Sequence, residues 1–138
     1  DAFTAGWFRT GDIGYRDTRG YVFINDRKTD MVISGGENIY PAELERILDG
    51  IDGIIEAVVV GAPDDHWGEI PVAIVVVDED SRITAEDIMS AFKGCLARFK
   101  HPKAVGFVSA LPRNVMGKVL KHELRRALGE GSIALIQR

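Results

Sequence analysis

Two apolar runs rich in β-branched residues constrain the fold of this chain most strongly. They cover Ile54 to Val60 and Ile70 to Val77. Valine and isoleucine favour strands, and an uninterrupted apolar run is typical of a strand that is covered on both faces. The two runs therefore predict central strands of one sheet, with other elements packed on each side.

The flanking segments predict the remaining elements. Pro41 suits the first turn of a helix, and a second helix is expected from about Thr84 towards Arg98. The other predicted elements are a short strand over 31–34, a third central strand over 104–109 and a closing helix that starts near Lys118. The order β-α-β-β-α-β-α predicts an α+β fold, a small mixed sheet of about three central strands plus an N-terminal hairpin, flanked by helices.

The first 23 residues differ from the rest in carrying six of the eleven aromatic residues, interspersed with glycines. Glycines at this density predict turns and short strands. The segment is too short for a core of its own, so we expect it to pack against something else. The polar stretch Asn25 to Asp30 is predicted to be a connector, and no element is predicted for the tail from Gly131.

Composition excludes several classes of protein. The net charge of -4 gives no overall attraction to nucleic acid or to an anionic membrane. The run from Ile70 to Val77 is far too short for a transmembrane segment. Cys95 stands alone and shares a helical face with apolar residues, which predicts a buried core thiol in a cytoplasmic protein. The three histidines have no metal-like spacing, so we expect no metal site in this chain.

Lys118 is the strongest candidate for chemistry. It follows Gly117 at the predicted start of the closing helix, on a loop whose backbone can approach a ligand closely. There the ammonium can meet a phosphate or a carboxylate. Taken alone, the same pattern also fits a solvated lysine at a helix start.

Other segments carry weaker signals. Asp12 ends a glycine turn and can accept hydrogen bonds from two vicinal hydroxyls, or simply stabilise its own turn. Gly35 and Gly36 suit a narrow passage for a chain-like ligand, or a plain loop. Trp67 fits a ligand wall or a core aromatic. The segment 99–103 combines an aromatic with three potential cations, which suits a nucleotide or an ordinary helix end.

Taken in order, four segments closely resemble the C-terminal part of the adenylate-forming acyl-CoA synthetases, relatives of firefly luciferase and of the adenylation domains of peptide synthetases. The matching segments are GWFRTGD (6–12), DRKTDMVISGGENIYPAELE (26–45), GAPDDHWGEIPVA (61–73) and LPRNVMGKVLKHELR (111–125). The resemblance implies four parts, and we expect the chain to begin inside a larger protein. These parts are terminal strands of a large N-terminal domain (1–26), a hinge (27–30), a C-terminal lid domain (31–128) and a tail (129–138).

The resemblance also implies residue roles. In this family ATP and a carboxylic acid form an acyl-adenylate with loss of pyrophosphate. The small domain then rotates, and a thiol, usually that of CoA, attacks the adenylate. By match, Asp12 would bind the ribose hydroxyls, Arg27 would contact the nucleotide, and Lys118 would enter the site only for adenylation. The hinge position falls on Thr29, where relatives commonly carry Asp or Lys, with Asp30 beside it.

For the thiol step the resemblance implies a second set of residues. The loop of Gly35 and Gly36 would line the pantetheine tunnel, with Trp67 as a wall, while Phe99 and Lys103 would lie near the CoA nucleotide. Some relatives carry Arg at the position of the neighbouring His101, which puts a phosphate contact there in doubt at neutral pH.

The expected function is therefore that of the C-terminal domain of an ATP-dependent acyl-CoA synthetase, an acid–thiol ligase acting on a fatty or aryl acid. Its partners would be its own N-terminal domain, the carboxylic acid, ATP and CoA, with Mg²⁺ held by residues outside this chain. The chain alone is expected to be inactive, because Lys118 has no substrate pocket to enter. Two alternatives stay open: an enzyme that loads a carrier-protein phosphopantetheine, and a stand-alone α+β module that binds nucleotide or RNA. The acidic charge and the lack of an aromatic RNA-binding strand argue against the module.

Overall fold

A six-stranded mixed sheet forms the centre of the molecule. The computed structural model describes residues 2–137. The sheet consists of β5 (Val32–Ser34), β6 (Glu37–Ile39), β7 (Ile54–Asp64), β8 (Gly68–Val77), β9 (Ala104–Phe107) and β10 (Leu135–Gln137). Its order is β10-β9-β8-β5-β6, with β7 also paired to β8, and only the β8/β9 pair is parallel. The predicted α+β class and the two central strands are confirmed.

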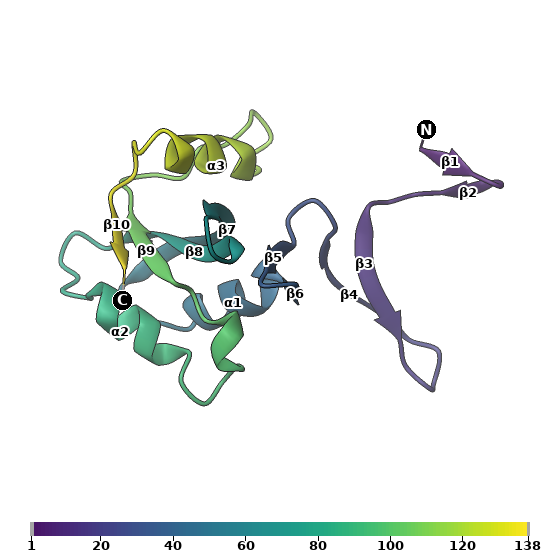
Figure 1. Cartoon of the computed structure of the whole chain (residues 1–138), viewed down its shortest axis with the longest axis horizontal. Helices are drawn as coiled ribbons and strands as arrows, with labels where there is room; N and C mark the ends of the chain where they lie inside the picture. The colour runs from purple at the N-terminus through teal and green to yellow at the C-terminus, as the bar shows by residue number, and fades with distance from the viewer. Residues whose placement is uncertain (1, 138) are drawn as a thin grey trace.

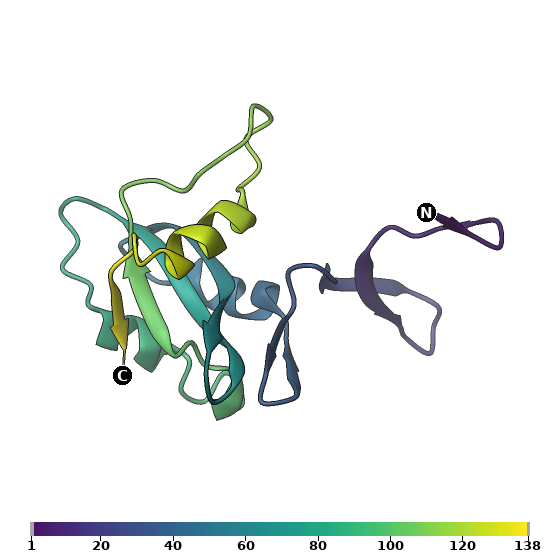
Figure 2. The ribbon, with the colours of Figure 1, turned by 45° about the horizontal axis from the view of Figure 1, so that its top comes forward.

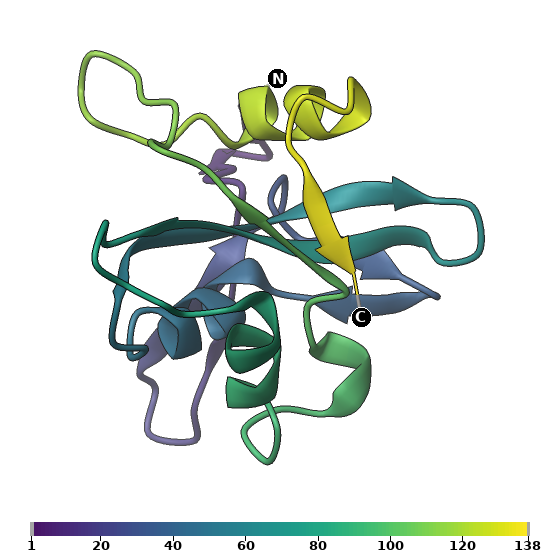
Figure 3. The same ribbon diagram turned by 90° about the vertical axis from the view of Figure 1, so that its left-hand side faces the viewer.

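Helices cover both faces of this sheet. They are α1 (Pro41–Leu48), α2 (Ala85–Ala91) and α3 (Lys121–Gly129). In Figure 3, α3 lies on one side of the strands, and α1 and α2 lie on the other. Alternate residues of the central strands serve the two faces: Val59 and Val75 join the cluster under α1 and α2, whereas Val60 and Ile74 pack with Leu124 of α3. This two-sided burial explains why the runs are continuously apolar.

The N-terminal residues form two separate hairpins that extend away from the sheet (Figures 1 and 2). These are β1 (Phe3–Thr4) with β2 (Trp7–Phe8), and β3 (Asp12–Arg16) with β4 (Val22–Arg27). Their aromatic side chains are largely exposed, Trp7 by 79%. The predicted hairpin is confirmed. The expected connector from Asn25 is wrong in its first half, because β4 continues to Arg27 and pairs with Asp12.

The second predicted helix is too long. α2 ends at Ala91, and the chain then turns through Gly94, whose φ of +80° is a left-handed conformation that glycine adopts easily. A short 3₁₀ helix follows at Arg98–Lys100. Cys95 therefore lies on this turn, and it is exposed rather than buried in the core as predicted.

The C-terminal part also differs from expectation. α3 begins at Lys121, three positions after the predicted start near Lys118. The tail beyond α3 turns back and adds β10 to the edge of β9, with Ile133 and Leu135 packed on the core under α3. Within residues 2–137, no helix has the length and apolar character needed to span a bilayer.

A capping box at the start of α2 leads to a prediction about pH. The carboxylate of Asp87 accepts hydrogen bonds from the Thr84 hydroxyl (2.6 Å) and the Thr84 N–H (2.9 Å), and these lower the pKa of Asp87 below the usual 3.8. A carboxyl whose pKa is lower in the folded state stabilises the fold above its unfolded pKa, and this contribution is lost as pH falls through the folded pKa. We expect Thr84→Ala to raise the pKa of Asp87 towards its ordinary value in an NMR titration. Ser90→Ala, on the same helix, is the control, and an unchanged Asp87 titration in Thr84→Ala would contradict the prediction.

Candidate active site

Lys118 lies on a tightly bonded turn before α3. The carboxamide oxygen of Asn114 accepts hydrogen bonds from the N–H groups of Met116 (3.0 Å) and Lys118 (2.9 Å). The N–H of Asn114 in turn donates to the carbonyl of Lys118 (2.9 Å). Gly117 supplies the positive φ, +81°, that closes the turn. The backbone of Lys118 is thus held at both its N–H and its C=O.

Arg113 fastens this turn to the sheet. Its guanidinium donates to the carbonyl of Gly117 and forms an ion pair with Glu56 of β7 (2.8 Å). Arg113 also forms an isolated β-bridge with Val119. The ammonium of Lys118 itself is exposed and has no ion-pair partner among residues 2–137. The turn therefore presents a free positive charge from a rigid base.

We call residues 27–30, from the end of β4 onward, the linker segment. Lys118 shares a pocket of about 600 Å³ with Arg27, Thr29 and Asp30 of this segment, and we call it the linker pocket. Its lining residues are Arg27, Thr29, Asp30, Val58, Asn114, Lys118, Val119, Leu120, Lys121, His122 and Arg125. Lysine and arginine outnumber the single acidic residue, so the pocket favours an anion. The structure thus brings together Lys118, Arg27, Thr29 and Asp30, which lie about 90 positions apart in the sequence.

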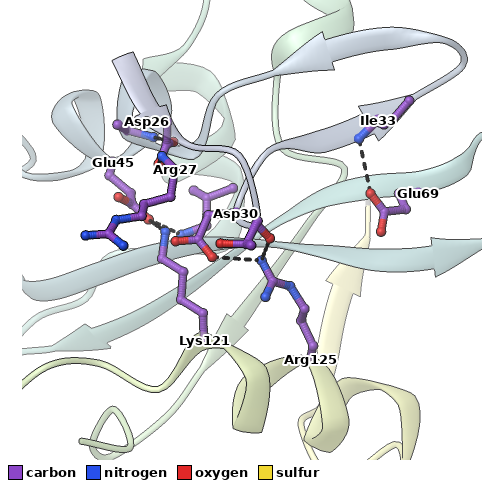
Figure 4. A network of polar contacts seen from close by, with 11 residues as sticks. Asp26, Arg27, Asp30, Ile33, Glu45, Glu69, Lys121 and Arg125 are labelled. Carbon is purple, nitrogen blue, oxygen red and sulfur yellow. Dashed lines mark hydrogen bonds and ion pairs between the residues drawn. The ribbon is translucent and has the colours of Figure 1, made fainter. Parts of the chain in front are cut away.

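Ion pairs determine which cations of the linker pocket are free. Lys121 pairs with Glu45 of α1 (2.7 Å), and Arg125 pairs with Asp30 (3.3 Å), as Figure 4 shows. Glu45 also accepts a hydrogen bond from the N–H of Val59 in β7 (2.9 Å). Lys121 and Arg125 are therefore occupied in holding α3 to the rest of the chain, which leaves Lys118 as the side chain able to meet a new anion.

Asp12 reaches the same region through Arg27. The two residues are paired across β3 and β4, and the Arg27 Nε lies 3.0 Å from the Asp12 carboxylate. Both groups are partly exposed, so the pair contributes little to stability. The structure thus places Asp12, which is expected to bind the ribose hydroxyls, beside Arg27, which is expected to contact the nucleotide.

A second pocket, of about 650 Å³, holds three of the residues expected at the thiol substrate, and we call it the tryptophan pocket. It is lined by Asp64, Trp67, Ile70, Arg98, Phe99, His101, Pro102, Lys103 and Gln137. It shares no lining residue with the linker pocket. Two aromatic rings and two cationic side chains around one hollow suit a ligand with a base and phosphates.

The loop of Gly35 and Gly36 lies against the wall of the tryptophan pocket. The Gly35 N–H donates to the carbonyl of Trp67 (2.9 Å), and a Cβ added at Gly35 would stand only 2.7 Å from the indole Cε3. A Cβ at Gly36 would meet nothing within 4 Å. Gly35 is therefore required for the close contact with Trp67, whereas Gly36 leaves open space beside it.

The side chain of His101 is half-buried between the turn after α2 and Phe92. Its Nε2 lies 2.9 Å from the carbonyl of Leu96, and its ring stands 5.9 Å from that of Phe92. One ring nitrogen thus holds the turn after α2, and the side chains of Arg98 and Lys103 line the same pocket together with the carboxylate of Asp64. Among the described residues, no group of three His, Cys, Asp or Glu side chains could hold a metal ion.

The sequence profile that defines the AMP-binding enzyme C-terminal domain matches residues 43–118, more than half of the chain, and the match ends on Lys118. The chain belongs to the AMP-binding enzyme C-terminal domain family. The resemblance inferred from the four ordered segments is confirmed.

Members of this family that resemble the chain include CoA ligases. The long-chain-fatty-acid–CoA ligase FadD13 of Mycobacterium tuberculosis is 53% identical over 125 residues, which are 91% of this chain and 25% of that protein. The indoleacetate–CoA ligase of Aromatoleum aromaticum is 48% identical over 121 residues, 88% of this chain and 24% of the ligase. The chain spans about a quarter of the length of these curated relatives.

Two solved structures of a further family member, one with ATP bound and one without, are similar to this chain. ATP-bound MatB from Rhodopseudomonas palustris matches with a TM-score of 0.85 at 45% identity, over 91% of this chain and 25% of that one. The apo form of MatB matches over the same shares with a TM-score of 0.76 at 46% identity. The similarity to the ATP-bound form is therefore the higher of the two.

Proposed function

We propose that this chain is the C-terminal domain of an ATP-dependent acyl-CoA synthetase. The whole enzyme would convert a carboxylic acid, ATP and CoA to acyl-CoA, AMP and pyrophosphate through an acyl-adenylate. FadD13 is named for long-chain fatty acids and another relative for indoleacetate, which supports a fatty or aryl acid as substrate. The exposed hairpin residues up to 26 would belong to the large domain, and residues 27–30 would be the hinge.

The free ammonium of Lys118 on its rigid turn is the observation that carries this proposal. In the first half-reaction a carboxylate oxygen attacks the α-phosphorus of ATP, and the bond to pyrophosphate breaks. Negative charge grows on the phosphoryl oxygens as this happens. Lys118 would bridge the carboxylate and the phosphoryl group, with Arg27 and Asp12 next to it for the nucleotide. The contribution of the lysine is electrostatic and positional, with no proton transfer.

In the second half-reaction the domain would present its other pocket. The CoA sulfur attacks the acyl carbon, the thiol proton is lost, and AMP leaves. The tryptophan pocket suits this role because Gly35 allows the chain to lie flat against Trp67, while Phe99 and Lys103 stand nearby. The two pockets share no residue, so the two half-reactions would use different side chains of the domain.

The arrangement described here corresponds best to the first half-reaction. The joint position of Arg27, Thr29 and Lys118 in the linker pocket supports this assignment.

The charge of the tryptophan pocket favours CoA over a carrier protein as the thiol substrate. The two thiols share the pantetheine arm, and CoA adds a nucleotide with phosphates. Arg98, Lys103 and Phe99 offer two cations and an aromatic face for that nucleotide. Mg²⁺ would be held by residues outside this chain, in the large domain.

Pyrophosphate exchange tests the proposed function. A protein that joins this chain to the large domain of its relatives is expected to exchange pyrophosphate into ATP with a suitable carboxylic acid from a panel. This chain alone is expected to show no exchange. The joined protein should then transfer the acyl group to CoA much faster than to a phosphopantetheinyl carrier protein. Exchange by the chain alone, no exchange with any acid, or a preference for the carrier would each contradict the corresponding part of the proposal.

A further inference from the structure

Helix α1 is capped by a residue that lies before the linker segment. Tyr40, at the N-cap, makes no side-chain hydrogen bond, so the first turn lacks the usual local acceptor. Instead, the N–H of Ala42 donates to the Asp26 carboxylate of β4 over 2.9 Å, in partly buried surroundings. The carboxylate also sits at the positive end of the helix, where negative charge is favourable.

On the other side of the linker, α3 fixes the backbone. The guanidinium of Arg125 donates to the carbonyl of Thr29 over 3.3 Å. It also donates to the carboxylate of Asp30 over 3.3 Å (Figure 4). The peptide plane that joins Thr29 to Asp30 is therefore attached to α3 and to the sheet beneath it. A rotation between the hairpins and the sheet must use backbone torsions upstream of this plane, at Lys28 and Thr29.

Such a rotation breaks the contact between Asp26 and Ala42. Asp26 precedes the rotating torsions and moves with the hairpins, whereas Ala42 follows them and moves with the sheet. The carbonyl of Arg27, which accepts hydrogen bonds from the N–H groups of Asp30 (3.0 Å) and Met31 (3.3 Å), is affected in the same way. The Asp26 contact would therefore be lost in any arrangement that such a rotation produces.

We propose that Asp26 is a positioning residue. By capping α1 across the hinge, it holds the domain in the arrangement in which Lys118 serves adenylation. This inference rests on the proposed function. A contact present in one of two arrangements shifts their populations by its own free energy. Losing it is expected to change the ratio of the two arrangements about fivefold, which corresponds to about 1 kcal/mol, a typical contribution of a helix cap.

Hydrogen exchange in this chain tests the contact without reference to activity. Asp26→Ala is expected to speed exchange of the Ala42 amide about fivefold, and Asp26→Asn is expected to restore most of the protection, because an Asn oxygen also accepts at a cap. Thr84→Ala is the matched control, since it removes the cap of α2 inside the sheet domain. Unchanged exchange at Ala42 in Asp26→Ala, or equal exchange in Thr84→Ala, would overturn the inference.

The two half-reactions of the joined protein test the consequence. Asp26→Ala is expected to slow pyrophosphate exchange about fivefold and to leave thioester formation from supplied acyl-adenylate equal or faster, with Asp26→Asn close to the parent. An equal loss in both half-reactions, or no change in their ratio, would overturn the role of Asp26. Lys118→Ala in the same assay keeps the two proposals apart. If Lys118→Ala does not affect exchange, the proposed function itself fails.

Discussion

Replacing Lys118 with alanine in the joined protein is expected to slow adenylation by about 10²–10³-fold, the usual effect of removing one preorganised charge stabiliser from a transition state. The turn of Asn114 and Gly117 already fixes the backbone of the lysine, so only its side chain has to be ordered when the ammonium meets the phosphoryl group. Thioester formation from supplied acyl-adenylate should change little, because Lys118 lies outside the tryptophan pocket. The two rates can be measured as pyrophosphate exchange and as acyl-CoA release.

A second lysine serves as the control for this prediction. Lys93 is exposed on the turn after α2 and lines neither pocket, so Lys93→Ala should leave both half-reactions unchanged. An equal loss of both half-reactions in Lys118→Ala would show that the lysine serves a step common to the two. That outcome would contradict the proposal that the domain uses a different pocket in each half-reaction.

The central sheet was predictable because its signal is local. The β-branched runs that form β7 and β8 are buried on both faces, so their pattern carries the information about both layers. The end of α2 was not predictable from spacing alone. Apolar residues such as Leu96 continue the helical period past Ala91, but the left-handed turn at Gly94 stops the helix and places Cys95 in solvent.

Strand β10 shows the limit of local patterns. Its apolar residues are only Leu135 and Ile136, with Ile133 two positions before the strand, and a run this short is ambiguous between strand and irregular chain. It becomes a strand because the outer edge of β9 is free to pair and because the core under α3 can bury these side chains. Both conditions belong to the tertiary structure.

The candidate site likewise contains residues that the sequence predicts and residues that it does not. Asp12, Arg27, Gly35, Trp67 and Lys118 were found from motifs whose order is specific, and the structure gathers them into two pockets and their rims. The residues that support them were missed. Asn114, Arg113 and Arg125 act through hydrogen bonds to backbone carbonyls or amides, and Asp26 caps a helix 16 positions away. Such contacts leave no periodic trace in a single sequence.

Gly35→Ala is expected to have the second large effect, on thioester formation. The new Cβ would stand 2.7 Å from the Trp67 ring, and the backbone of Trp67 cannot withdraw easily, because its N–H donates to Asp64 and its C=O accepts from Gly35. The indole must therefore swing away from the pocket wall. A misplaced wall of this kind should slow attack by CoA by about 10- to 100-fold while pyrophosphate exchange stays near normal.

Gly36→Ala separates the clash from backbone strain. Both glycines have positive φ, +59° and +85°, so either alanine should lower the free energy of unfolding by about 1–2 kcal/mol. Only Gly35→Ala meets the indole, and only it should change the fluorescence of Trp67, measured in a Trp7→Phe background. Equal fluorescence changes in the two variants would mean that strain in the loop, and not contact with Trp67, governs the pocket. An equal loss of both half-reactions in Gly35→Ala would instead point to general unfolding, because the linker pocket contains neither glycine nor Trp67.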